Sequence, residues 1–194
     1  MFDSGISVKN LIEELNTEVD IALQIPNATY VQWLNSLQQL LYTEIIKEQR
    51  KIDIKPAPSS PFSLSLLNVP NTRFEDIYTI YADKTQLIKS TVASGVIFPN
   101  TFYKQNDNVG YHTKNVPSEM TIVYFVKPAL IKENDNSNVM VPIEFIDLVK
   151  AKLRGEAYKL ANEGELSAMW LNDYNILLET FKAWIAEKSP NFGM

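Results

Sequence analysis

Four prolines between residues 55 and 70 constrain the fold of this chain more than any other feature. They are Pro56, Pro58, Pro61 and Pro70. Inside a helix, a proline removes a backbone hydrogen bond and its ring clashes with the preceding turn. We therefore expect an extended connection here, with a short strand at residues 63–67 on the edge of a sheet, where strands tolerate proline.

The residues before this connection have helical periodicity. Apolar side chains at residues 7–24 and 28–48 recur every three or four positions, which predicts two helices separated by Pro26. Ser7 and Asn27 precede these segments and are expected to cap them, because their side chains can accept hydrogen bonds from free amide groups.

A second pair of helices is predicted at residues 142–162 and 164–188. Pro142 suits the first helical position, and Gly164 suits the turn between the helices. So short a break predicts an antiparallel hairpin. Trp170, Phe181 and Trp184 follow helical spacing and are expected to lie in the core. We expect Trp170 and Phe181 to face three residues of the first helix of the pair, namely Val149, Leu153 and Leu160.

Between the connection and the hairpin, the sequence favours β-strands. β-Branched and aromatic residues are concentrated at 74–82, 86–92, 96–98 and 120–126, as is typical of strands. The polar run Gln105-Asn106-Asp107-Asn108 predicts a hairpin loop.

These elements predict an α+β, mostly helical fold. The N-terminal helices and the C-terminal antiparallel helical hairpin would form a helical bundle with a β-rich insertion in the middle. We divide the chain into N-terminal helices at 1–54, the proline-rich connection and β-rich insertion at 55–131, and the hairpin and tail at 132–194. The first and last parts would pack as one domain.

Catalysis and cofactor binding are not expected. The chain has no cysteine and one histidine, His112, which excludes a thiolate nucleophile or a multi-histidine metal site. Its 6 glycines form no phosphate-binding loop. A calcium-loop template beginning at Glu133 aligns Asp135 and Glu144, but Asn138 replaces the turn glycine and Pro142 interrupts it. We therefore expect no enzyme activity, no cofactor and no metal.

The charge balance argues against a dedicated DNA-binding surface. The net charge is −5, from 18 basic and 23 acidic residues, whereas nucleic-acid-binding domains usually carry a basic excess. The best basic cluster is Lys150, Lys152 and Arg154, and its acidic neighbours predict local ion pairs on a solvated helix. No apolar run approaches the roughly 20 residues of a membrane span. The absence of cysteine fits assembly in a reducing cytoplasm.

The C-terminal third resembles the head-to-tail adaptor proteins of tailed bacteriophages. The resemblance rests on a proline-initiated helix, a glycine-acidic turn and a helix with aromatic anchors. It is carried by Val141-Pro142-Ile143-Glu144-Phe145, by residues 152–161, by Asn162-Glu163-Gly164-Glu165, and by residues 168–174 and 181–184. The first half is similar only in its order of elements.

The resemblance implies a structural protein of the virion neck, assembled in the host bacterial cytoplasm. Its copies would form a ring, commonly of about twelve subunits, that joins the portal protein to the tail or to further neck proteins. DNA would pass through without sequence-specific binding, and no membrane would be involved. Another head-closure, tail-completion or baseplate component, or a non-catalytic α+β protein-binding module, is the alternative.

Two groups of residues are candidate interaction sites. The C-terminal tail has two apolar side chains and cannot continue the preceding helix past its proline. The resemblance implies that this tail binds the portal. Aromatic residues near the predicted hairpin are candidates for a subunit or tail-side interface. The tail residues are Ser189, Pro190, Asn191, Phe192, Gly193 and Met194, and the aromatic residues are Phe98, Phe102, Tyr103 and Tyr111.

Overall fold

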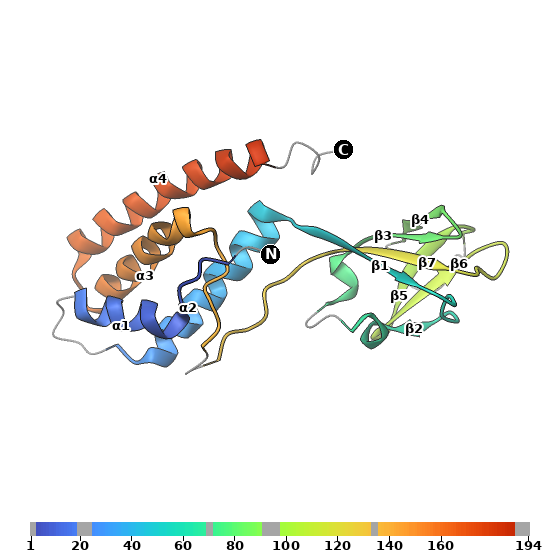
Figure 1. Ribbon diagram of the computed structural model, residues 1–194, viewed down its shortest axis with the longest axis horizontal. Helices are drawn as coiled ribbons and strands as arrows, with labels where there is room; N and C mark the ends of the chain where they lie inside the picture. The colour runs from blue at the N-terminus through green and yellow to red at the C-terminus, as the bar shows by residue number, and fades with distance from the viewer. Residues whose placement is uncertain (1–2, 19–24, 69–71, 91–97, 133–135, 189–194) are drawn as a thin grey trace. The chain divides into compact units, whose positions relative to one another are not determined.

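The computed structural model describes residues 3–18, 25–68, 72–90, 98–132 and 136–188. The chain folds into two compact units (Figure 1). The helical unit comprises Met1–Ile46 and Leu130–Met194, and the sheet unit comprises Lys47–Ala129. The polypeptide passes from the helical unit to the sheet unit between Ile46 and Lys47, and it returns between Ala129 and Leu130.

In the helical unit, α3 is the central element. It packs against α1, α2 and α4, and its buried side chains, from Ile146 to Ala157, point in several directions. Together the helices bury one continuous apolar core. The elements are α1 (Val8–Glu18), α2 (Asn27–Leu40), the π-helical η1 (Leu41–Ile46), the short 3-10 helix η4 (Ile143–Phe145), α3 (Ile146–Leu160) and α4 (Gly164–Lys188).

The predicted N-terminal cap of the first helix is confirmed, whereas the predicted cap of the second helix is wrong. Ser7 caps α1, because its Oγ accepts a hydrogen bond from the amide of Asn10 at 3.1 Å. Asn27 is instead the first residue of α2, after Pro26, and no side chain caps that helix. The carboxamide oxygen of Asn27 accepts a hydrogen bond from the Asn16 side chain at 3.3 Å.

The turn of the C-terminal hairpin depends on Asn162 rather than on Gly164. Asn162 adopts the left-handed conformation, with φ at 62°. The amides of Asn162 and Glu163 then bond back to the carbonyls of Lys159 and Tyr158, which satisfies the end of α3. Gly164 begins α4.

Close contact between α3 and α4 requires a glycine at position 155. A Cβ at Gly155 would lie 2.7 Å from the side chain of Leu171 and 3.3 Å from its backbone nitrogen. Beside this contact, the hydroxyl of the buried Ser167 donates a hydrogen bond to the Gly155 carbonyl at 2.9 Å. The lack of a side chain at position 155 therefore allows the two helices to approach closely at this point of α3.

We expect Gly155→Ala to destabilise the protein by about 1–3 kcal/mol, because overpacking a tight contact forces neighbouring atoms to move. Gly164→Ala is the matched control, since a Cβ there meets nothing within 4 Å. Chemical denaturation of both variants measures the difference. Equal stability of the two variants would show that α3 and α4 can separate without cost.

The sheet unit contains a curled seven-stranded mixed sheet in the order β1-β7-β3-β4-β5-β6-β2. Only β4 and β5 pair in parallel; the other neighbours in this order are antiparallel. Its apolar core is separate from that of the helical unit. The strands are β1 (Gln49–Ile54), β2 (Phe62–Ser63), β3 (Ile77–Ala82), β4 (Thr85–Lys89), β5 (Thr101–Gln105), β6 (Asn108–His112) and β7 (Met120–Phe125), with 3-10 helices η2 (Leu64–Leu67) and η3 (Phe74–Asp76).

The prediction of a mostly helical bundle is therefore wrong. Helix accounts for 49% of the residues that the structure describes, and the 22% in strands forms an extensive sheet rather than a minor insertion. Residues 49–54, assigned from the sequence to the N-terminal helices, form the edge strand β1. In this segment Ile52 and Ile54 alternate with charged residues and pack on the core of the sheet unit. An alternation of every second residue is the period of a strand, and the assignment to a helix overlooked it.

Both passages between the units adjoin one pair of strands. β1 follows the first passage along the chain, and β7 precedes the second. They pair over their full length from Gln49↔Phe125 to Ile54↔Met120, and the Val126 amide extends this ladder to the Glu48 carbonyl at 2.8 Å. The sheet unit is thus an insertion held at its base by two paired strands.

Candidate interaction surfaces

The four aromatic residues proposed as an interface occupy different environments. Phe102 is fully buried in the core of the sheet unit, and Tyr111 is buried with its hydroxyl donating to the Pro58 carbonyl at 2.7 Å. Tyr103 covers Gly110 on the neighbouring strand, where a Cβ would lie 2.4 Å from its ring. Phe98 is 55% exposed. Phe98 is therefore the one of these four side chains that presents a large apolar surface to solvent.

The other predicted residues divide between confirmed contacts and positions outside the described residues. Lys152 pairs with Glu156 at 2.7 Å, whereas Lys150 and Arg154 pair with Glu14 and Glu18 of α1. The predicted local ion pair is thus confirmed for Lys152 alone. Lys150 and Arg154 pair with a different helix, and their side chains are mostly buried rather than solvated. The tail, Ser189–Met194, lies outside the described residues, as do positions 133–135 of the loop tested as a calcium site.

A different surface, which the sequence did not indicate, lies on the outer face of β1, β7 and β3. Tyr78 and Phe125 meet edge to face with ring centroids 5.7 Å apart, and Tyr78 is half exposed. Beside them is a shallow concavity of about 380 Å³ with both charge signs at its rim. It is lined by Lys51, Tyr81, Asp83, Lys84, Glu119, Thr121 and Val123. We call this region the outer sheet face.

Asp83 organises one end of the outer sheet face. Asp83 and Lys84 form the two-residue turn between β3 and β4, and both have positive φ, at 46° and 70°. The Asp83 carboxylate accepts hydrogen bonds from the Ser118 hydroxyl at 2.8 Å and from the amides of Ser118 and Glu119. The Ser118 hydroxyl first, and then the Glu119 amide, hold the pKa of Asp83 below its ordinary 3.8. The carboxylate thereby ties this turn to the start of β7.

Asp83→Asn should make stability less sensitive to acid. Because the folded-state pKa of Asp83 is lowered, its contribution is fully present above the unfolded pKa and is lost as pH falls through the folded value. The difference in urea midpoint between wild type and Asp83→Asn should therefore be largest near neutral pH and shrink below about pH 4. Ser118→Ala, which removes the largest cause of the shift, should reproduce part of this change. A midpoint difference that is constant with pH would contradict the assignment.

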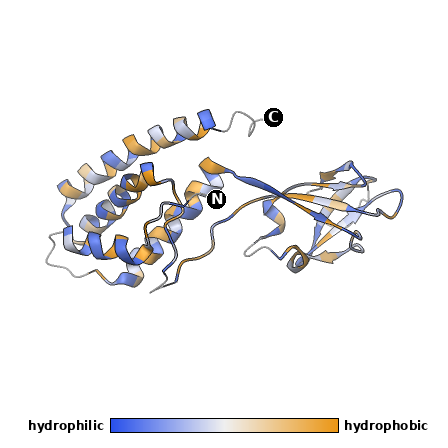
Figure 2. Cartoon of the chain, viewed as in Figure 1, coloured by the Kyte–Doolittle hydropathy of each residue, from blue (hydrophilic) through white to orange (hydrophobic). Residues whose placement is uncertain are grey.

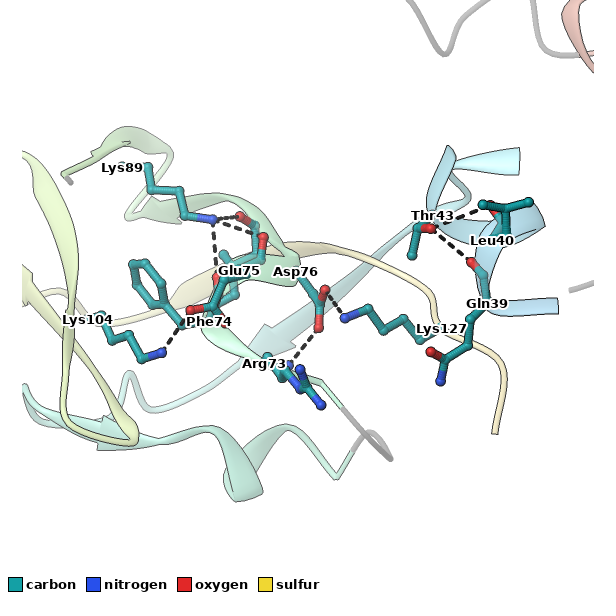
Figure 3. Close-up of polar contacts among 11 residues, drawn as sticks. Gln39, Leu40, Thr43, Arg73, Phe74, Glu75, Asp76, Lys89, Lys104 and Lys127 are labelled. Carbon is teal, nitrogen blue, oxygen red and sulfur yellow. Dashed lines mark hydrogen bonds and ion pairs between the residues drawn. The ribbon is translucent and has the colours of Figure 1, made fainter. Parts of the chain in front are cut away.

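A second polar cluster holds η3 against the sheet (Figure 3). Lys89 Nζ donates to the carbonyls of Phe74, Glu75 and Ile77 at 3.1, 3.1 and 2.8 Å, and it lies 4.9 Å from the centre of the Phe74 ring. Desolvation lowers the pKa of Lys89, while the carboxylates of Glu75 and Asp76 act in the opposite direction.

The neighbouring carboxylate completes this cluster. Asp76 is buried, accepts a hydrogen bond from the Arg73 amide at 2.8 Å and pairs with Lys127 at 2.6 Å. The charged groups of Lys89, Asp76 and Lys127 therefore each have a partner within the sheet unit. Such saturated groups stabilise a turn, and they leave little capacity to bind a ligand.

The described residues contain no cluster suited to metal binding. No group of three or more His, Asp or Glu side chains among them could hold a metal ion. His112 is exposed at the end of β6, where it lines a shallow concavity of about 270 Å³ together with residues of the loops at 59–60 and 113–117. Within the same residues, none of the helices has the length and apolar character needed to cross a bilayer.

Comparison with known proteins adds no assignment. No protein-family model matches the chain, and no curated protein sequence matches it significantly.

Proposed function

We propose that this protein is a structural component of a bacteriophage neck: a head-to-tail adaptor whose copies form a ring between the portal and the tail. The resemblance of residues 141–184 to such adaptors is the origin of the proposal. In this role the helical unit forms the ring, the C-terminal tail binds the portal, and DNA passes through the centre without sequence-specific contact.

The observation that best supports a docking role is the outer sheet face. Tyr78 on β3 is 50% exposed, and the Tyr78–Phe125 pair presents aromatic surface beside charged residues. Aromatic residues surrounded by polar groups are typical of protein interfaces. We assign this face to the next neck or tail component, because its mixed charges and shallow shape suit a protein partner better than a small molecule.

Mixing the full-length protein with the portal protein of the same genome tests the proposal. We expect the protein to bind as a complete ring, of about twelve copies, which mass photometry detects as a discrete increase in the mass of the portal. A stable dimer that does not bind the portal would contradict the adaptor function and favour another virion component.

Deleting residues 189–194 should abolish this binding without lowering the thermal stability of the isolated protein. The reason is that Phe192 and Met194 would be buried on the portal, where two apolar side chains contribute about 3–6 kcal/mol before ordering costs. The matched control is Phe192→Ala with Met194→Ala in the full-length chain, which should bind as poorly as the deletion. A truncated protein that melts earlier and still binds would show that the tail caps its own helix.

A further inference from the structure

The helix that α2 and η1 form together changes its repeat near its end. α2 is α-helical as far as Leu40, whereas the six residues of η1 are π-helical. In an α-helix, residues four positions apart lie on the same side. In a π-helix the hydrogen bonds join residues five positions apart, and such turns are rare and frequently mark functional sites. The change of repeat decides which side chain of η1 reaches the core.

Two adjacent isoleucines compete for one place in the core of the helical unit. Leu41 has no exposed surface, and Ile46, five residues later, is 4% exposed. Ile45, four residues after Leu41, is partly buried and packs against the same core. Figure 2 shows the hydrophobic character of this last turn. The π-helical repeat buries Ile46 beside Leu41, whereas an α-helical repeat would bury Ile45 there and turn Ile46 away by about 100°.

A buried polar side chain lies one turn before η1. Gln38 is 1% exposed, and within the part of the chain that the structure describes neither the oxygen nor the nitrogen of its carboxamide has a hydrogen-bond partner. Buried polar atoms are nearly always paired, because leaving one unpaired is unfavourable. The packing at the end of α2 therefore carries a cost that a different arrangement of the neighbouring side chains could remove.

The backbone of the same segment is strained. Lys47, the residue after η1, has φ at 47°, which is unfavourable for residues other than glycine and is typical of switch regions. The Thr43 hydroxyl donates to the carbonyls of Gln39 at 2.9 Å and Leu40 at 3.4 Å (Figure 3). A hydroxyl bonded back to the preceding turn favours a bend in a helix. Local contacts thus support the π-helical turn at the expense of strain at its end.

We propose that η1 is a two-register switch. Besides the π-helical register with Ile46 in the core, it adopts an α-helical register with Ile45 in the same place. The change turns the end of the helix by about 100° about its axis, at the point where the chain leaves the helical unit. It also alters the surroundings of Gln38, because Tyr42, buried one turn further on, moves with η1. One isoleucine replaces another in the core, so the change buries a similar apolar area in both registers. The inference goes beyond the adaptor function and does not depend on it.

Thiol labelling reads out the register, because the chain has no cysteine of its own. In the observed register, Ile46→Cys should react with a maleimide at least about tenfold more slowly than Ile45→Cys, since a buried thiol reacts only when the structure opens. Adding Ile46→Lys to Ile45→Cys should then slow the thiol at position 45 by about tenfold. The reason is that an unpaired charge is unfavourable in the core, so the helix rewinds and buries position 45 instead.

The direction of this change distinguishes a switch from damage to the core. If η1 has a single register, Ile46→Lys loosens the packing and the thiol at position 45 reacts as fast as before or faster, which would overturn the proposal. Glu44→Lys with Ile45→Cys is the matched control, since it adds a lysine beside position 45 at an exposed site and should not slow the thiol. Ile46→Ala with Ile45→Cys should slow it in the same direction, and this pair decides the question if circular dichroism shows that Ile46→Lys does not fold.

A deletion tests the π-helical repeat itself. Without Thr43, Leu41 and Ile46 are four residues apart, so an α-helix buries both, and this variant should melt at or above the temperature of wild type. Deletion of Ser36 is the matched control, because Ser36 is also exposed and its hydroxyl also donates to the carbonyl four residues earlier, that of Gln32, at 3.0 Å. It lies within the α-helical part, where a deletion moves core residues out of register and should lower the melting temperature by about 10 °C or more. Equal losses for the two deletions would show that the π-helical turn holds no surplus residue and would also overturn the proposal.

Discussion

Replacing Phe181 by alanine should lower the free energy of unfolding by about 3–5 kcal/mol, the usual cost of removing a buried phenylalanine. Phe181 has no exposed surface. Its ring meets Phe145 edge to face at 4.8 Å and stacks with Trp184 at 6.3 Å. The substitution therefore opens a cavity where α4 covers the start of α3, and urea denaturation followed by tryptophan fluorescence measures the loss.

Trp170→Ala is the matched comparison on the same helix. Trp170 was predicted to share the core with Phe181, but it is only half buried and lies beneath the Arg154 guanidinium, 4.6 Å from the ring centre. We expect its loss to cost about half as much, because the cost follows the apolar area removed from water. Equal losses, or a Phe181→Ala loss under about 1 kcal/mol, would show that the core is arranged differently.

Replacing Lys89 by methionine should destabilise the protein by about 2–3 kcal/mol, because three carbonyls lose a charged donor at once. Methionine keeps most of the apolar stem, so the change isolates the ammonium group. The expected effect is large for a lysine, since its amine is partly desolvated and held at 2.8 Å from the Ile77 carbonyl.

Lys104→Met provides the control in the same cluster. Lys104 pairs with Glu75 at 2.8 Å, but both side chains are more than half exposed, and exposed ion pairs contribute about 0–1 kcal/mol. Equilibrium denaturation of the two variants in parallel separates the roles. Similar losses for both would mean that Lys89 acts only as another surface charge.

Local patterns determined much of the secondary structure. The alternation of polar and apolar residues in strands, the loop at Gln105–Asn108 and the periodicity of α4 are properties of neighbouring residues, and the structure has a hairpin and a helix at those places. The cap at Ser7 is of the same kind, because a side-chain oxygen needs only the amide three residues later. The exclusion of a multi-histidine site or a thiolate also followed from composition alone.

Long-range pairing decided the rest. Gln49–Ile54 became a strand because β7, about seventy residues later, offers it a complete ladder, and no local signal predicts that partner. The burial of Phe102, the α1 partners of Lys150 and Arg154, and the three carbonyls around Lys89 depend in the same way on segments distant in sequence. Periodicity shows which side of an element is apolar, but packing in three dimensions determines which neighbours cover that side.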